Sequence, residues 1–342
     1  MIVNKYSLQF LIVVFIFSLI FILPVSLLVS IRELGTDTEN YKYSFYLFKE
    51  YSYISNEPGI YFFAWLSLLL GGDIELYFWF LFVSLIVFIN ISYYKAFKSL
   101  FNLEELCFFY FAFLGMYFFS TWFQVVSLSV LRHGLALLIL YYSLFLLIKG
   151  EVLRFFIFFV LSLFFHVSII LILPFILLLK LSEKKFYIVF FSLAIFYPLG
   201  VNEYFISTFS NLTGVPIYEL ISSYSKEDVR YFGFNYLYYS YTIFWSCFGL
   251  YIQKKVIDKS QYTVFSNVVK IYSCLAMVLF VFGFASFSNR YGLFSWLFIP
   301  FMQIVIFGVL FNKSLLRYFA SIVIFITGFL YYIDNFYDLN VF

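Results

Sequence analysis

Apolar stretches of about 20 residues recur along the whole chain, and they limit its possible folds more than any other feature. The stretch 7–31, for example, holds no charged residue. As an α-helix, about 20 residues span roughly 30 Å, the thickness of the hydrocarbon core of a bilayer. Of the 342 residues, 64% are hydrophobic and only 11% are charged, whereas about a quarter are charged in soluble domains. We therefore predict an all-α, polytopic integral membrane protein.

Lysine and arginine in the breaks between apolar stretches indicate sidedness, because such cations concentrate in cytoplasmic loops. The basic clusters are Lys5; Lys95 and Lys98; Lys149 and Arg154; Lys180, Lys184 and Lys185; Lys254, Lys255 and Lys259; and Lys313 with Arg317. Placing all of them in the cytoplasm requires that the short segment 58–72 dips into the membrane and returns, and that 155–180 is broken near His166. The result is one membrane domain, 1–342, with about eleven transmembrane or re-entrant helices in a GT-C-like bundle.

Nearly all the unusual polar residues then fall on the exoplasmic face, whose longest segments are the loops 32–75 and 201–235. The first carries Arg32, Asp37 and Glu57. A carboxylate there is a candidate general base for a sugar hydroxyl, and we favour Asp37 and Glu57. The alternative is that these are ordinary acidic residues of a solvated loop.

Two arginines begin apolar helices at the outer face, Arg132 in "SVLRHGLALLI" and Arg290 in "FSNRYGLF". A guanidinium inside the membrane is costly and usually faces a polar cavity. Because it grips phosphate oxygens with parallel hydrogen bonds, both arginines are candidate ligands of a diphosphate. The alternative is snorkelling to the headgroups. His133 is a candidate proton carrier or glycan contact, but neighbouring helical residues point about 100° apart, so it need not share a site with Arg132.

His166 lies among apolar residues where the topology demands a bend, and we expect it to line the same cavity. A histidine satisfied by a backbone carbonyl or serine is the alternative. The segment 201–235 is rich in tyrosine, and Tyr224, Arg230 and Tyr231 are candidate glycan contacts. An interfacial aromatic belt would explain the tyrosines equally well.

Several other classes of function are disfavoured by the composition. Two histidines and three cysteines are too few and too scattered for a zinc site. The net charge of +3 is mild and dispersed, so nucleic acid is not an expected partner. No phosphate-binding loop or dinucleotide fingerprint is present, and we expect no metal and no cofactor.

Five short motifs occur in a characteristic order: "GTDTENY" (35–41), "NEPGIYF" (56–62), "LRHGLAL" (131–137), "FFHVSII" (164–170) and "NRYGLF" (289–294). Their order and spacing resemble the EpsG-like family of Wzy-type polymerases, which make O-antigens of lipopolysaccharide, capsules and exopolysaccharides. One departure is visible: the family commonly has Arg-Gln where this chain has Arg132-His133. A role of that glutamine therefore does not carry over to His133.

The resemblance implies a reaction and a location. Such a polymerase transfers a growing glycan from undecaprenyl diphosphate to a hydroxyl of a new lipid-linked repeat unit, on the outer face of the bacterial cytoplasmic membrane and without a metal. Donor and acceptor are both undecaprenyl-diphosphate-linked oligosaccharides, and a flippase and a chain-length regulator act in the same pathway. Arg132 and Arg290 would bind the diphosphate, Asp37 or Glu57 would orient or deprotonate the acceptor, and His166 would line the cavity.

Three other functions are compatible with a polytopic chain of this kind. A flippase or transporter of lipid-linked oligosaccharides would need charged residues deep in several helices, whereas here they lie toward one face. An O-acyltransferase usually carries catalytic histidine or arginine in its first helices, and 7–31 has neither. A single-sugar GT-C glycosyltransferase would share the acidic first outer loop but would not make a ladder of repeats.

Overall fold

A computed structural model gives the fold of the chain and describes residues 12, 14, 16–31, 37–54, 57–222, 233–256, 259–285, 287–310 and 316–338. Throughout these residues the regular secondary structure is helical, without a strand, which confirms the all-α prediction. The chain divides into two compact units. Unit 1 comprises residues 1–169 and 303–342, and unit 2 comprises residues 170–302.

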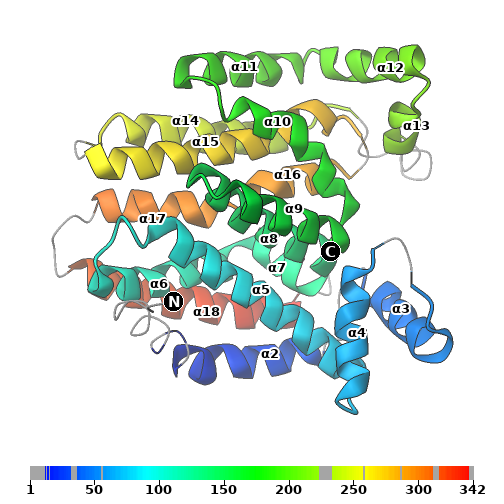
Figure 1. Cartoon of the computed structure of the whole chain (residues 1–342). Helices are drawn as coiled ribbons and strands as arrows, with labels where there is room; N and C mark the ends of the chain where they lie inside the picture. Colours follow the sequence, from blue (N-terminus) through cyan, green and yellow to red (C-terminus); the bar gives the residue numbers. More distant parts are fainter. Residues whose placement is uncertain are drawn as a thin grey trace. The chain divides into compact units, whose positions relative to one another are not determined.

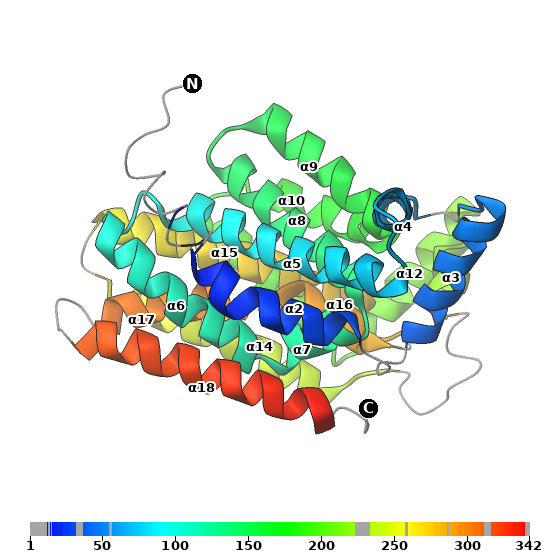
Figure 2. The same cartoon turned by 90° about the horizontal axis from the view of Figure 1, so that it is seen from below.

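Unit 1 is built around one buried helix, α8, which packs against α5 and α9 (Figure 1). Its helices are η1 (Ser18–Ile22), α2 (Leu23–Ser30), α3 (Thr38–Tyr51), α4 (Gly59–Leu69), α5 (Ile74–Phe97), α6 (Leu103–Phe119), α7 (Thr121–Leu128), α8 (Leu131–Ile148), α9 (Val152–Phe165) and α18 (Leu316–Asp338). α18 runs beside α6 (Figure 2). There a Cβ atom on Gly328 would lie 2.2 Å from the carbonyl oxygen of Gly115, so glycine allows the two backbones to touch.

Unit 2 is arranged around α15, against which α11, α14 and α16 pack. Its helices are α10 (Leu173–Leu178), α11 (Glu183–Phe196), α12 (Val201–Thr213), α13 (Ile217–Ser222), α14 (Tyr236–Gln253), α15 (Lys259–Phe282) and α16 (Ser288–Trp296). The unit boundaries fall inside η2 (Val167–Ile172) and α17 (Ile299–Leu310). In the core, the Trp296 indole donates a hydrogen bond to the Thr242 hydroxyl over 2.8 Å.

Five of the described helices are long and apolar enough to cross a membrane, or up to seven if each of two bent pairs is one span. The bent pairs are α6 with α7, at 72°, and α11 with α12, at 92°. The shorter apolar helices are Ile20–Ser30, Gly59–Leu69, Val152–Phe165 and Val167–Leu178. The chain is therefore a polytopic helical membrane protein, as its sequence predicts.

Neither 58–72 nor 155–180, the two segments expected not to cross the membrane as single helices, forms one continuous helix of membrane length. His166 has an extended backbone (φ −158°, ψ 118°) that ends α9. The segment 155–180 is therefore broken at the position that was predicted in order to place all the basic clusters in the cytoplasm. In 58–72 the helix α4 has 11 residues and is about 16 Å long, too short to cross a bilayer.

The segments that we expected to be loops are largely helical where they are described. The segment 32–75 contains α3 and α4, and 201–235 contains α12 and α13. The location of both segments on the outer face stays a prediction, and helices carry many of their polar residues. In α12, Asn202 and Ser210 are buried while Tyr204 and Leu212 are exposed.

Candidate functional site

A single carboxylate, that of Glu57, joins three separate parts of unit 1. Its Oε2 accepts a hydrogen bond from Arg132 Nη1 at 2.7 Å, and its Oε1 lies 2.5 Å from His166 Nδ1. The backbone of Val167 also lies near this carboxylate and favours its ionised form. Only 13% of the Glu57 side chain is exposed, against 31% for Arg132 and 23% for His166. The segment before α4, the start of α8 and the end of α9 thus meet at one ion-paired group.

The local sequence explains how Glu57 reaches the end of α9. Pro58 is the N-cap of α4, so Glu57 immediately precedes the helix. A Cβ atom on Gly59 would lie 2.9 Å from the carbonyl oxygen of Phe164 and 2.8 Å from the Phe165 ring. Only glycine lets the first turn of α4 approach α9 so closely, and this contact brings Glu57 against His166, the residue that follows Phe165.

Tyr41 of α3 holds Arg132 from the other side. The Arg132 backbone N–H, one of those left without a partner in the first turn of α8, donates to the Tyr41 hydroxyl at 3.1 Å. The Arg132 guanidinium carbon lies 5.3 Å from the centre of the Tyr41 ring, within range of a cation–π contact. Tyr41 is 2% exposed, so its position is fixed by packing.

Two more of the predicted site residues, Asp37 and His133, also lie near. The charge of Asp37, the N-cap residue of α3, acts on both Arg132 and Tyr41. His133 is buried, and the centre of its ring lies 4.7 Å from that of His166, with 50° between the ring planes. Although His133 need not share a site with Arg132 on a helix, the end of α9 packs over this turn of α8 and brings His166 to it.

The environment of Glu57 keeps it ionised. Burial opposes its charge, but the hydrogen bond from His166, the charges of His166 and Arg132 and the backbone of Val167 outweigh burial. Together they hold the pKa of the Glu57 carboxyl below its ordinary value of 4.5. An ionised carboxylate only accepts hydrogen bonds, so the proton of a neutral His166 must lie on Nδ1. The Nε2 atom of His166 then carries a lone pair.

This arrangement combines three chemical capacities. A carboxylate with a low pKa is a poor base, but it orients an imidazole and stabilises the imidazolium form, as in a Ser-His-Asp triad. The imidazole Nε2, with its lone pair, can accept a proton from a bound hydroxyl. Arg132 uses Nη1 on Glu57 and has other N–H donors for an anion. Among the described residues, no group of three or more His, Cys, Asp or Glu side chains is placed to hold a metal ion.

The predicted site residues divide into three groups. The first lies together in unit 1: Asp37, Glu57, Arg132, His133 and His166. Arg290 belongs to unit 2, where its guanidinium lies 4.9 Å from the centre of the Phe287 ring; its partnership with Arg132 stays a prediction. The predicted glycan contacts Arg32, Tyr224, Arg230 and Tyr231 lie outside the described residues. Tyr41 was missed, although it is the last residue of the "GTDTENY" motif, because a tyrosine in a Tyr-rich chain gives no signal.

A model of one known protein family covers nearly the whole chain. The model of the EpsG family matches residues 11–340. Neither the curated proteins nor the solved structures gave a match.

Proposed function

Because this chain belongs to the EpsG family of Wzy-type polysaccharide polymerases, we propose that it joins undecaprenyl-diphosphate-linked oligosaccharide repeat units into an O-antigen, capsule or exopolysaccharide. Donor and acceptor are both lipid-linked, and the product returns as a donor for the next round. The observation that carries the proposal is the group formed by Arg132, Glu57 and His166 at the start of a membrane helix.

The reaction breaks the bond between the anomeric carbon of the donor glycan and the diphosphate oxygen, and it forms a bond from that carbon to an acceptor hydroxyl oxygen. The hydroxyl loses its proton to Nε2 of His166, and Glu57 stabilises the resulting imidazolium. The bond electrons leave with the diphosphate, whose growing negative charge Arg132 stabilises. Glu57 is thus an orienting group, and the base is His166.

The other predicted residues take supporting roles. Asp37 orients the acceptor hydroxyl, and Arg290 is a second ligand of the diphosphate. Arg32, His133, Tyr224, Arg230 and Tyr231 contact the glycan chains. A flippase supplies the lipid-linked units, and a chain-length regulator acts on the same product.

The site faces the outside of the cytoplasmic membrane in this proposal. α8 has 18 residues and is about 27 Å long, with Arg132 in its first turn and Lys149 directly after its end. α9 returns along it, from Arg154 in its first turn to His166 after its last. The catalytic group and the basic residues therefore lie at opposite ends of the α8–α9 pair. Since basic ends are cytoplasmic, the catalytic group is exoplasmic.

The test is complementation of a deletion strain, with surface polysaccharide analysed on gels and protein amounts matched. Arg132→Ala and His166→Ala are expected to leave single repeat units and no ladder. The control Lys184→Ala, an exposed lysine of α11, is expected to give the full ladder. Full ladders from both site variants would refute the mechanism.

The same strains separate the polymerase from its alternatives. A flippase variant would accumulate precursor on the cytoplasmic side, where external glycosidases cannot reach it. A polymerase variant exposes single units outside, where they are digested. Loss of one sugar or of acyl groups, with the ladder intact, would instead indicate a single-sugar transferase or an O-acyltransferase.

A further inference from the structure

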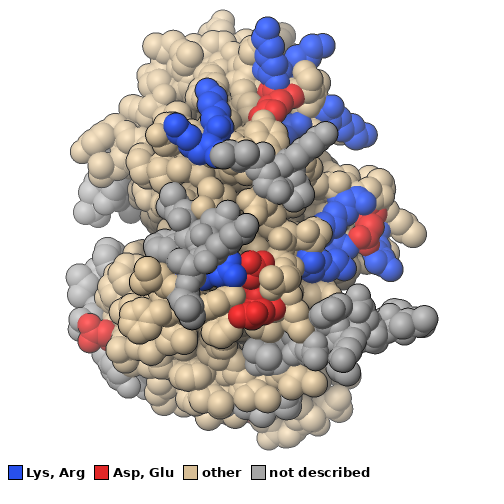
Figure 3. All heavy atoms as spheres, turned by 90° about the vertical axis from the view of Figure 1, so that its left-hand side faces the viewer, with Lys and Arg blue, Asp and Glu red and all other residues tan. Residues whose placement is uncertain are grey.

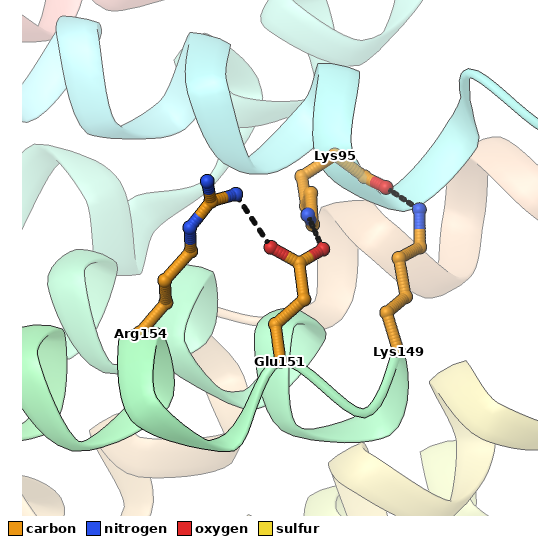
Figure 4. A network of polar contacts seen from close by, with 4 residues as sticks. All are labelled: Lys95, Lys149, Glu151 and Arg154. Carbon is orange, nitrogen blue, oxygen red and sulfur yellow. Dashed lines mark hydrogen bonds and ion pairs between the residues drawn. The ribbon is translucent and has the colours of Figure 1, made fainter.

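A second polar cluster of unit 1 lies where α5, α8 and α9 meet, at the end of α8 away from the catalytic group (Figure 4). Lys95 reaches from the last turn of α5 to the carboxylate of Glu151, in the turn between α8 and α9. Arg154 Nη1 binds the other oxygen of Glu151 at 2.8 Å. The ammonium of Lys149 donates to the backbone carbonyl of Lys95. In Figure 4, Arg154 and Lys95 are directed to the carboxylate of Glu151, and Lys149 is directed to the backbone carbonyl of Lys95.

The cluster carries more positive charge than its own carboxylate balances. Lys98, whose ammonium lies 5.2 Å from the centre of the Tyr94 ring, adds its charge to that of Lys95 at Lys149. Lys95 and Lys98 thus repel the charge of Lys149, while Lys95 and Arg154 attract that of Glu151. Burial, followed by the charges of Lys95 and Lys98, lowers the pKa of Lys149 to about 8. An added anion would relieve this repulsion and hold Lys149 charged.

The position of the cluster selects the kind of anion. α5 and α8 are both long and apolar enough to span a bilayer, and each ends beside the cluster. The ammonium and guanidinium groups therefore lie at the level of lipid headgroups. Lys95 is only 12% exposed, whereas Arg154 is 69% exposed, so the cluster has an inner cation and an outer one within reach of the surface. Figure 3 shows one face of the molecule, on which Lys and Arg side chains lie in separate groups with acidic side chains among them.

We propose that Lys149 and Arg154, with the charges of Lys95 and Lys98 beside them, form a site for the phosphate headgroup of an anionic phospholipid in the cytoplasmic leaflet. The headgroup phosphate accepts hydrogen bonds from Lys149 and Arg154, while Lys95 keeps Glu151 in place between them. This lipid site does not take part in the proposed glycosyl transfer, so the proposal stands even if that reaction is wrong.

The test uses the full chain in detergent, with phosphatidylglycerol binding measured by native mass spectrometry. Lys149→Gln/Arg154→Gln is expected to lower the affinity about 25-fold, at about fivefold for each charge removed near a membrane surface. Lys184→Gln/Lys185→Gln removes the same charge from the start of α11, where both lysines are exposed, and is expected to bind like the parent. Arg154→Gln alone changes a largely exposed side chain, so this variant is expected to fold. Its affinity for phosphatidylglycerol is expected to lie between those of the parent and the double variant.

Two further arms identify the anion. Phosphatidylcholine, with the same acyl chains and no net charge, is expected to bind far more weakly and equally to all variants. Inorganic phosphate is expected to raise the melting temperature less than phosphatidylglycerol does. The proposal is overturned if both double variants lose the same affinity, if phosphatidylcholine binds as well as phosphatidylglycerol, or if inorganic phosphate stabilises the protein as much as the lipid.

Discussion

The substitution Glu57→Gln tests the proposed catalytic group most sharply, because it removes a charge and almost no volume. Two cationic or polar donors bind separate oxygens of Glu57, Arg132 at 2.7 Å and His166 at 2.5 Å. The amide of glutamine offers one oxygen and one NH₂ group. If its oxygen faces Arg132, the NH₂ group must donate to Nδ1 of His166, which moves the proton of His166 to Nε2. The base then presents the wrong tautomer to the acceptor.

Two magnitudes follow from this geometry. A hydrogen bond to a charged group contributes about 1.5–3 kcal/mol, but the glutamine side chain retains both contacts in neutral form and Arg132 is 31% exposed to solvent. We therefore expect the free energy of unfolding to fall by only about 1–2 kcal/mol. The rate should fall much further, by about 10²–10⁴-fold, the usual contribution of a general base.

The assay is ladder formation by the purified protein in lipid nanodiscs, with synthetic lipid-diphosphate-linked repeat units and with thermal unfolding followed in parallel. Glu57→Asp, which keeps the charge, should recover part of the rate. Glu50→Gln, an exposed carboxylate of α3, should leave it unchanged. Polymerisation by Glu57→Gln at the parent rate would refute the reasoning, and so would a rate loss no larger than the loss of folded protein.

Three further outcomes are expected from the same structure. Gly328→Val should unfold at a markedly lower temperature, because its Cβ would lie 2.2 Å from the carbonyl oxygen of Gly115 where α6 and α18 touch. Thr242→Val should lower the free energy of unfolding by about 1–3 kcal/mol, since the buried indole of Trp296 loses its acceptor. Because the pKa of Glu57 is lowered by folding, the carboxylate stabilises the protein above its ordinary pKa of 4.5, and this contribution is lost as the pH falls through its lower folded value. The melting temperature of the parent should therefore drop more steeply in acid than that of Glu57→Gln.

Matched controls decide these three predictions. Ile326→Ala, on an exposed position of α18, should cost little, and a loss equal to that of Gly328→Val would show that helix contact is not the cause. Thr242→Ser keeps the hydroxyl and should be milder than Thr242→Val. Equal acid sensitivity of the parent and of Glu57→Gln would contradict the pKa argument.

Much of the site could be found from the sequence, because charged and titratable residues are rare in apolar segments. Arg132 and His166 stood out for that reason, and Asp37 and Glu57 stood out as carboxylates of the first outer segment. The structure places all four in unit 1. Their partnerships could not be found, since Glu57 is 75 residues from Arg132 and 109 from His166. The role of Tyr41 was hidden by the abundance of tyrosine, and only its contact with the first turn of α8 sets it apart.

The sequence by itself determined the membrane class, the all-helical fold and the break at His166, because each depends on local hydropathy or on the distribution of charge along the chain. Only the tertiary structure shows that Glu57 accepts hydrogen bonds from Arg132 and His166, which lower the pKa of its carboxyl and make it a poor base. That outcome depends on a close approach of α4 to α9, which Gly59 permits and which a one-dimensional pattern does not encode. Hydropathy determines whether a segment lies in lipid or in water, whereas the packing of the helices determines which residues each charged side chain contacts.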